Sequence, residues 1–259
     1  MLGGWLTKFN FGPARKGRFI CHIGPPKTGT TSVQKALQNL NASDIHYLGT
    51  KQPRNTNEPN TLFADLSYAV RSETTPAEQR AIKRRIGKII SVKQYIIVSE
   101  EMLLISQQGA TYVDKLSRLA QLLKGTDTRL ILTLREPVSA LKSFYTEIYY
   151  RQETRPLVSF EAFLASDQAS IFDYPALLSA LKSAGFPKVK LLSFTREQAD
   201  LRLAELTGCS EHTDSLTLET ANETEPELRA RIDALTVPQA LAENLAEGYQ
   251  HALNLAKGS

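Results

Sequence analysis

Five short runs of mostly apolar residues mark the chain, and each is bounded by glycine, proline or polar positions. The runs lie at 18–23, 45–48, 95–98, 129–134 and 189–192. Short runs of this kind, rich in Ile, Leu and Val and without strict alternation, are typical of strands that are buried on both faces. The sequence therefore predicts five short, largely buried β-strands.

Between these runs, apolar residues recur every three or four positions, which is the spacing of one face of a helix. The clearest helix start is Thr-Pro-Ala-Glu at 75–78, a capping box with proline at the first helical position. Strands that alternate with helices predict an α/β fold with a parallel central sheet of about five strands flanked by helices. Ligands bind such sheets beyond the carboxyl ends of the strands. Further helices are predicted at 32–40, 61–70, 112–123, 137–152, 160–165 and 174–184, and from residue 195 as helical segments broken around Gly208 and Pro238.

The composition is that of an ordinary globular protein. The 259 residues are 42% hydrophobic and carry a formal net charge of +4, which excludes a disordered chain and a polycationic tail. The charge gives no reason to expect a nucleic-acid partner. Two cysteines cannot form a disulfide framework, and the scattered histidines predict no metal site.

Residues 1–17 are expected to form an N-terminal arm and residues 18–259 a single domain. Trp5, Leu6 and Phe9 in the arm are expected to pack on the domain, and docking on a membrane surface or a partner is the alternative. No stretch approaches the roughly 20 apolar residues of a membrane span. The arm also lacks the apolar core of a signal peptide. We therefore expect no integral membrane segment and a cytoplasmic location.

The first chemical motif is Gly-Pro-Pro-Lys-Thr-Gly-Thr-Thr at 24–31, between the first strand and the first helix. Such a junction presents unpaired backbone N–H groups at the positive end of a helix dipole, and these bind phosphate or sulfate. Gly29 allows close backbone approach, and Lys27 adds a full positive charge. The anion-binding residues predicted here are Lys27, Thr28, Gly29, Thr30, Thr31 and Ser32.

This loop differs from the Walker A motif, G-x-x-x-x-G-K-[ST], in one respect. Gly24 and Gly29 have the Walker A spacing, but Thr30 stands where that motif has lysine. A nucleoside triphosphatase would lose its clamp on the β- and γ-phosphates. The sequence therefore argues against a P-loop kinase or nucleotidase, which remains an alternative class.

The second motif begins at Arg135, directly after the fourth strand. At 100° per residue, Ser139, Ser143 and Glu147 share one face of the helix that follows. Because the carboxyl ends of parallel strands meet at one edge, Arg135 and Ser143 are predicted to bind a second anion near the first loop. The opposite, core-facing side is predicted to carry Val138, Leu141, Tyr145 and Ile148.

These two motifs together resemble those of the sulfotransferase family. Residues 26–32, Pro-Lys-Thr-Gly-Thr-Thr-Ser, resemble its 5′-phosphosulfate loop, and Arg135 with Ser143, eight positions apart, resembles its 3′-phosphate motif. Residues 22–34 are similar to the segment HIG-x-x-KTGTTS-x-Q of a bacterial branch. The resemblance implies a P-loop NTPase-like sulfotransferase fold, with 3′-phosphoadenosine 5′-phosphosulfate (PAPS) as co-substrate and adenosine 3′,5′-bisphosphate as product.

Sulfuryl transfer by in-line displacement needs a cation at the leaving phosphate oxygen, and Lys27 is the candidate. It also needs a general base. Glu100 and Glu101 follow the third strand, and Ser-Glu-Glu resembles the Ser-Ser-Glu of bacterial relatives, which favours Glu101. The alternative is that these acids open a helix. His46 is a second candidate base, while His22 and Cys21 are expected to be buried structural residues.

The resemblance favours a hydroxyl acceptor on a carbohydrate, such as a polysaccharide or glycolipid precursor. Two further hypotheses are a small-molecule or lipid sulfotransferase and a non-catalytic nucleotide-binding protein. A basic stripe on one helix is either a solvated face or a docking surface for an anionic acceptor; its members are Arg80, Arg84 and Lys88, with Lys83 and Arg85 beside it. An acceptor cleft is a hypothesis for Tyr145, Tyr149, Tyr150, Arg151 and Arg155.

Overall fold

The computed structural model describes residues 17–52, 61–107, 109–150, 158–186, 189–193, 200–207, 215–217 and 226–257. The predicted N-terminal arm, apart from Gly17, lies outside these described residues, and so do Arg151 and Arg155. Among the described helices, none combines the length and the apolar composition that a membrane crossing requires.

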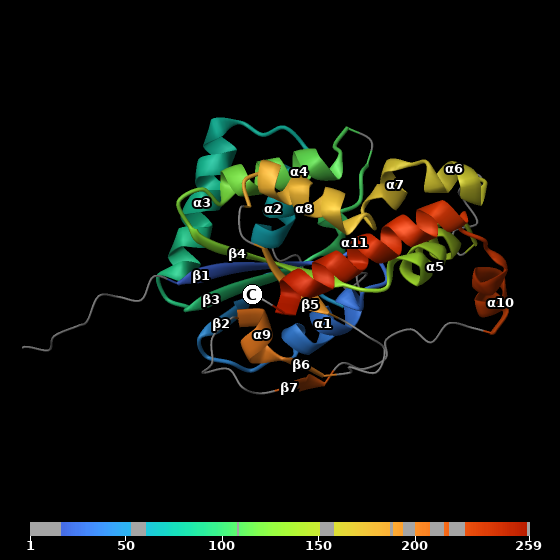
Figure 1. The fold of residues 1–259 in the computed structure, drawn as a ribbon. Coiled ribbons are helices and arrows are strands. Elements are labelled where there is room, and N and C mark those ends of the chain that lie inside the picture. Colours follow the sequence, from blue (N-terminus) through green and yellow to red (C-terminus); the bar gives the residue numbers. More distant parts are fainter. Residues whose placement is uncertain are drawn as a thin grey trace, which may run out of the picture.

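A five-stranded, all-parallel sheet forms the centre of the fold (Figure 1). The spatial order is β2-β3-β1-β4-β5, so β1 lies in the middle. The sequence analysis predicted all five strands, and β4 begins two residues earlier than expected. Because the strands are parallel, the segments that follow β1, β3 and β4 leave the sheet at the same edge. The strands are β1 (Arg18–Ile23), β2 (Ile45–Tyr47), β3 (Tyr95–Ser99), β4 (Asp127–Leu134) and β5 (Val189–Ser193).

Helices cover both faces of the sheet (Figure 1). On one face lie α2 (Thr61–Arg71), α3 (Pro76–Ile90), α4 (Tyr112–Leu122) and α8 (Tyr174–Ser183). On the other face lie α1 (Thr30–Gln38) and α9 (Leu203–Thr207). The α/β class with flanking helices, predicted from the alternation of strands and helices, is thus confirmed.

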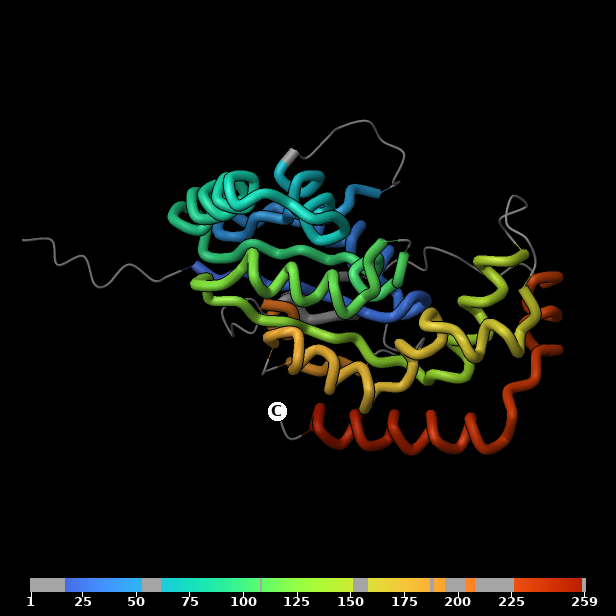
Figure 2. Tube along the Cα trace, turned by 90° about the horizontal axis from the view of Figure 1, so that it is seen from above, coloured from blue at the N-terminus to red at the C-terminus, as the bar shows by residue number. Residues whose placement is uncertain are grey.

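The remaining helices lie on the side of the molecule next to β5 (Figure 1). They are α5 (Pro137–Tyr150), α6 (Phe160–Leu164), α7 (Asp167–Ser170), α10 (Pro226–Ala234) and α11 (Gln239–Lys257). Figure 2 shows α11 along the outer edge beside α8, with α10 near α6. A short 3₁₀ helix, η1 (Glu101–Leu103), follows β3.

The core explains why the strands read as continuous apolar runs. Phe19, Cys21 and Ile23 of β1 are fully buried against the helices of the α4 face, while Ile20 is buried against the α1 face. Burial of Phe19, Ile20 and Ile23 contributes about 1.5–3 kcal/mol for each side chain. A strand covered on both faces has no solvent side, so polar alternation is lost.

Two strands near the C-terminal end of the chain correct the sequence analysis, which predicted only helices after residue 195. β6 (Asp200–Arg202) and β7 (Ser215–Thr217) form an antiparallel pair. Each strand has three residues, which is too short to show a hydrophobic period, and the pairing is made by backbone groups.

Candidate functional site

The loop after β1 is built around a close contact between Gly24 and Thr28. The hydroxyl of Thr28 donates to the carbonyl oxygen of Pro25 at 2.7 Å, and Thr28 is 1% exposed. A Cβ atom on Gly24 would lie 2.2 Å from that hydroxyl oxygen, so no other residue fits there without a shift. The Thr28 hydroxyl proton is committed inside the loop, and its side chain shapes the loop.

Gly29 opens α1 and leaves the first turn of that helix without a side-chain cap. Its φ of 79° lies in the left-handed region, which glycine adopts without strain. The N-cap makes no side-chain hydrogen bond to the first-turn N–H groups. Thr31 and Ser32 on this turn are partly exposed, while Thr30 is buried. An uncapped helix start at this edge of the sheet suits an anion.

Lys27 is held at both ends in an unusual conformation. Its φ of 71° is the one positive φ of a non-glycine residue among the described residues, and such a conformation costs about 1–2 kcal/mol. Its carbonyl oxygen accepts a hydrogen bond from the guanidinium of Arg135. Its Nζ lies 2.7 Å from Oε2 of Glu147 on α5. The structure thus brings Lys27 to two residues that are 108 and 120 positions away in the sequence.

The backbone of Arg135 is itself fixed by a buried tyrosine. The hydroxyl of Tyr174, the first residue of α8, donates to the Arg135 carbonyl at 2.7 Å and accepts from the Arg135 N–H at 3.0 Å. Burial raises the pKa of Tyr174 above its ordinary value, so the hydroxyl keeps the proton it donates. Sequence reasoning missed this contact, and nothing local in the sequence marks it.

The helix face predicted for α5 is confirmed. Ser139 is exposed and Ser143 and Glu147 are partly exposed, while Leu141, Tyr145 and Ile148 on the opposite side are buried. Ser143 therefore lies between Arg135, which precedes the helix, and Glu147, which contacts Lys27. The sequence placed Glu147 on this face but gave it no role.

Glu100 and Glu101 occupy different environments after β3. Glu100 is 5% exposed, and its carboxylate accepts hydrogen bonds from the Met102 N–H at 2.9 Å and from the Thr50 hydroxyl. It caps η1, so the expectation that these acids open a helix holds for Glu100. Glu101 is the first residue of η1 and is partly exposed.

A buried lysine that the sequence analysis overlooked holds the segment after η1. Lys115 of α4 has no exposed surface. Its Nζ donates to the carbonyls of Met102 (3.1 Å) and Ile105 (2.6 Å) and to Oε1 of Gln107 (3.0 Å). Burial, with a smaller contribution from Arg71, lowers the pKa of Lys115 to about 8. The sequence did contain a sign of this burial, because Lys115 lies one turn before Leu119 on the apolar face of α4.

Two residues of β1 were expected to be structural, and both are. Cys21 is fully buried, and burial together with the nearby Glu100 carboxylate raises its pKa to about 12. His22 is 1% exposed and hydrogen-bonded through both ring nitrogens, and burial lowers its pKa to about 4. His46, the second candidate base, lies in the middle of β2; burial and the charge of Lys93 lower its pKa.

The tyrosines proposed for an acceptor cleft separate into core and surface. Tyr145 is 3% exposed and packs among aromatic rings, with its hydroxyl donating to the Val158 carbonyl at 2.7 Å, so the cleft hypothesis is wrong for this residue. Tyr149 and Tyr150 are partly exposed. The guanidinium of Arg231 on α10 lies 4.8 Å from the centre of the Tyr150 ring.

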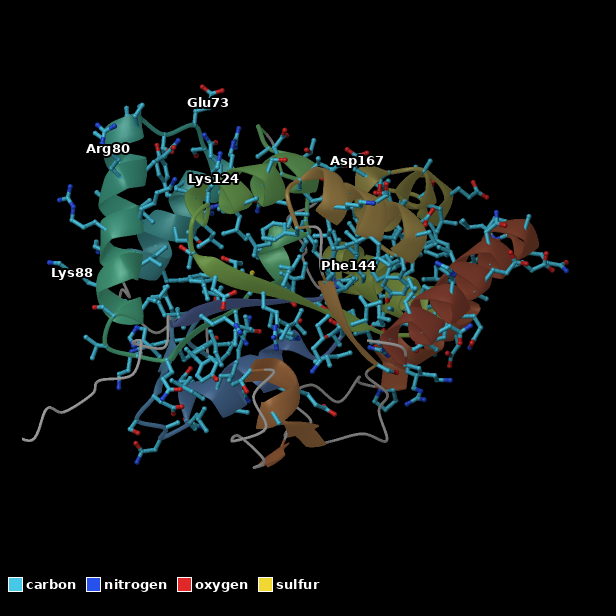
Figure 3. All side chains as sticks on the ribbon, turned by 60° about the vertical axis from the view of Figure 1, so that its left-hand side comes forward. Glu73, Arg80, Lys88, Lys124, Phe144 and Asp167 are labelled. Carbon is cyan, nitrogen blue, oxygen red and sulfur yellow. The ribbon has the colours of Figure 1, made fainter. Side chains whose placement is uncertain are left out.

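The basic stripe of α3 lies on an exposed helix face. Arg80, Arg84 and Lys88 are exposed, and Figure 3 shows Arg80 and Lys88 projecting away from the rest of the molecule. Arg85, beside the stripe, pairs with Asp65 of α2. The role of the basic stripe as a docking surface for an anionic acceptor stays a prediction.

Comparison of the chain with protein-family models, with curated proteins and with solved structures gave no match. Within the described parts of the chain, no three His, Cys, Asp or Glu side chains come together as a metal site requires. The geometry itself therefore defines the candidate site. It consists of the loop after β1 with its lysine, the arginine that follows the neighbouring strand β4, and two carboxylates at the end of β3.

Proposed function

We propose that this protein is a sulfotransferase with a P-loop-like fold that uses PAPS as sulfuryl donor. The observation that carries the proposal is the hydrogen bond from the Arg135 guanidinium to the Lys27 carbonyl. That bond joins the anion-binding loop after β1 to the cation after β4. A donor with a phosphosulfate at one end and a phosphate at the other matches two such adjacent sites.

In this proposal, the first anion site holds the 5′-phosphosulfate. The N–H groups at the start of α1 and the hydroxyls of Thr31 and Ser32 bind its oxygens. Arg135 and Ser143 bind the 3′-phosphate, since a guanidinium gives charge-assisted and bidentate contacts to phosphate oxygens. ATP has no 3′-phosphate, and the absence of lysine after Gly29 also disfavours it.

The transfer step is a displacement at sulfur. The acceptor oxygen forms a bond to sulfur while the bond between sulfur and the bridging phosphate oxygen breaks. The bond's electron pair stays on the phosphate oxygen. Lys27 stabilises the negative charge that develops there, and its fixed backbone provides the preorganisation that makes such a contact effective. Without a bound donor the Lys27 ammonium pairs with Glu147 of α5, and in this proposal the phosphosulfate takes the place of that carboxylate.

The acceptor hydroxyl loses its proton to a carboxylate, and we propose Glu101 for this role. Glu100 is the weaker candidate because its two carboxylate oxygens already accept hydrogen bonds from Met102 and Thr50 in a buried position. Glu101 is partly exposed at the same sheet edge. The bond from the Glu100 N–H to the His22 carbonyl, 3.1 Å, keeps this segment beside β1.

The proposed acceptor class is a carbohydrate hydroxyl, which the resemblance to the bacterial branch supports. The test is transfer of radiolabelled sulfate from PAPS to a panel of sugars, glycolipids, lipids and phenols. We expect the wild-type protein to label at least one carbohydrate. Labelling of phenols or lipids alone would move the proposal to a small-molecule or lipid sulfotransferase.

The matched variants are Lys27→Ala and Lys124→Ala, the latter an exposed lysine after α4 (Figure 3). Lys27→Ala should lower kcat on the order of 100-fold or more, because it removes a contact to charge that develops in the transition state. Lys124→Ala should keep wild-type turnover. No transfer to any acceptor would contradict the proposed function. A normal kcat with a raised KM for PAPS in Lys27→Ala would show that Lys27 only binds.

A further inference from the structure

A buried chain of hydrogen bonds crosses the three central strands just below the candidate site. Nδ1 of His22 on β1 lies 2.9 Å from the hydroxyl oxygen of Ser99 on β3, and Nε2 lies 2.6 Å from that of Thr133 on β4. The exposed fractions are 1% for His22, 0% for Ser99 and 5% for Thr133. We call these three residues the polar bridge.

Each residue of the polar bridge lies one or two positions before a part of the candidate site. Ser99 directly precedes Glu100, His22 lies two residues before Gly24, and Thr133 lies two residues before Arg135. The bridge therefore ties the three strands together at the point where they leave the sheet.

The bridge also reaches α1, the helix that follows the loop after β1. The carbonyl of Ser99 accepts a hydrogen bond of 2.9 Å from the side-chain amide of Gln34, a fully buried residue of α1. The side-chain carbonyl oxygen of Gln34 accepts a hydrogen bond from the side-chain amide of Gln52, in the segment after β2. Gln34 belongs to the motif of residues 22–34, and the proposed reaction gives it no task.

We propose that His22, with Ser99 and Thr133, is a positioning residue that fixes the spacing of the loop after β1, Arg135 and the Glu100–Glu101 segment. A neutral imidazole has one N–H donor and one acceptor nitrogen, so one hydroxyl accepts from the ring and the other donates to it. Burial favours this neutral form at physiological pH. Loss of either hydroxyl leaves a buried ring nitrogen without its partner, and the strand ends are then free to shift.

The consequence for turnover rests on the proposed function, whereas the bridge itself does not. The first variant is Thr133→Val, which replaces the hydroxyl by a methyl group of similar size. Thr133→Ser keeps the hydroxyl. Thr128→Val makes the same change near the other end of β4, where the Thr128 hydroxyl donates to the nearby Thr126 carbonyl at 3.3 Å.

Hydrogen exchange followed by mass spectrometry reads the bridge without any activity. In Thr133→Val we expect amides of the segments 24–31 and 100–104 to exchange about tenfold faster. Thr133→Ser and Thr128→Val should leave these segments at wild-type protection. Ser99→Ala removes the other hydroxyl of the polar bridge and should increase amide exchange in the same two segments.

Sulfate transfer gives the second measurement. We expect kcat to fall about tenfold in Thr133→Val and to stay within about twofold of wild type in Thr133→Ser. A distant mutation that misplaces the reacting groups by about 1 Å can lower the rate by about 100-fold. Unchanged amide exchange in Thr133→Val would show that the polar bridge does not hold these segments in place. Faster exchange with unchanged kcat would overturn its role in positioning. If no variant and no wild-type sample transfers sulfate, the proposed function fails, and the exchange data alone decide whether the bridge positions these loops.

Discussion

Glu147→Gln should tighten the binding of adenosine 3′,5′-bisphosphate. The substitution keeps the shape of the side chain but removes a negative charge 2.7 Å from the Lys27 ammonium. The two side chains are 20% and 44% exposed, so water screens the pair, and its strength is about 0.2–1 kcal/mol. Nucleotide binding to the wild-type protein must break the Lys27–Glu147 pair, and this free-energy cost is absent in Glu147→Gln.

A second contribution comes from repulsion between the carboxylate and the bound phosphate. Two like charges roughly 6 Å apart in a water-like dielectric repel by about 0.7 kcal/mol. The two contributions together predict an affinity about 5- to 15-fold higher, since 1.4 kcal/mol is tenfold in Kd. Titration calorimetry at low salt measures this change, and it should shrink at about 0.3 M salt because of screening.

The matched control is Glu73→Gln, which makes the same change of net charge at an exposed position between α2 and α3 (Figure 3). Its Kd should stay within about twofold of wild type. Unchanged or weaker binding in Glu147→Gln would show that the Lys27 ammonium does not face the anionic group of the nucleotide.

Arg135→Ala should weaken binding of adenosine 3′,5′-bisphosphate by about 2 kcal/mol or more, and Ser143→Ala by less, because a guanidinium makes charge-assisted hydrogen bonds. Calorimetry of both variants measures these changes. Wild-type affinity in both variants would show that Arg135 and Ser143 have a structural role only. Burial lowers the pKa of His22 to about 4, so the unfolded chain binds a proton first, and stability should fall from about pH 6.5 to about pH 4 by up to about 3 kcal/mol. Urea unfolding at several pH values should show this slope in the wild type and a smaller one in His22→Asn; equal slopes would contradict it. Cys21 should resist alkylation in the native protein because burial raises the pKa of its thiol to about 12; peptide mapping that finds it modified without unfolding would contradict this.

The sheet could be predicted because its signal is local. A strand buried on both faces needs mostly apolar residues, and the five runs show that composition within four to six residues. The pair β6–β7 could not be predicted in this way. Its strands are held by backbone pairing with a segment more than ten residues away, which leaves no pattern in three side chains.

In the candidate site too, features set by neighbouring residues could be predicted and features set by distant contacts could not. The loop after β1 could be predicted because a strand, two glycines and a helix start are consecutive in the sequence. The positive φ of Lys27 and its ion pair with Glu147 could not, because the partner is 120 residues away and is set by the packing of α5. Lys115 was missed because a lysine in a helix is ordinarily exposed. Only the structure shows three acceptors around its ammonium.

The central claim is that two neighbouring anion sites recognise a nucleotide with both a 3′- and a 5′-anion. The most direct test is calorimetric titration of the wild-type protein with adenosine 3′,5′-bisphosphate, ADP and ATP under the same conditions. We expect adenosine 3′,5′-bisphosphate to bind at least about tenfold more tightly than ADP or ATP, because in the proposal Arg135 and Ser143 contact a phosphate that the other two lack. Equal or tighter binding of ATP would contradict the account and would favour a P-loop nucleotide kinase.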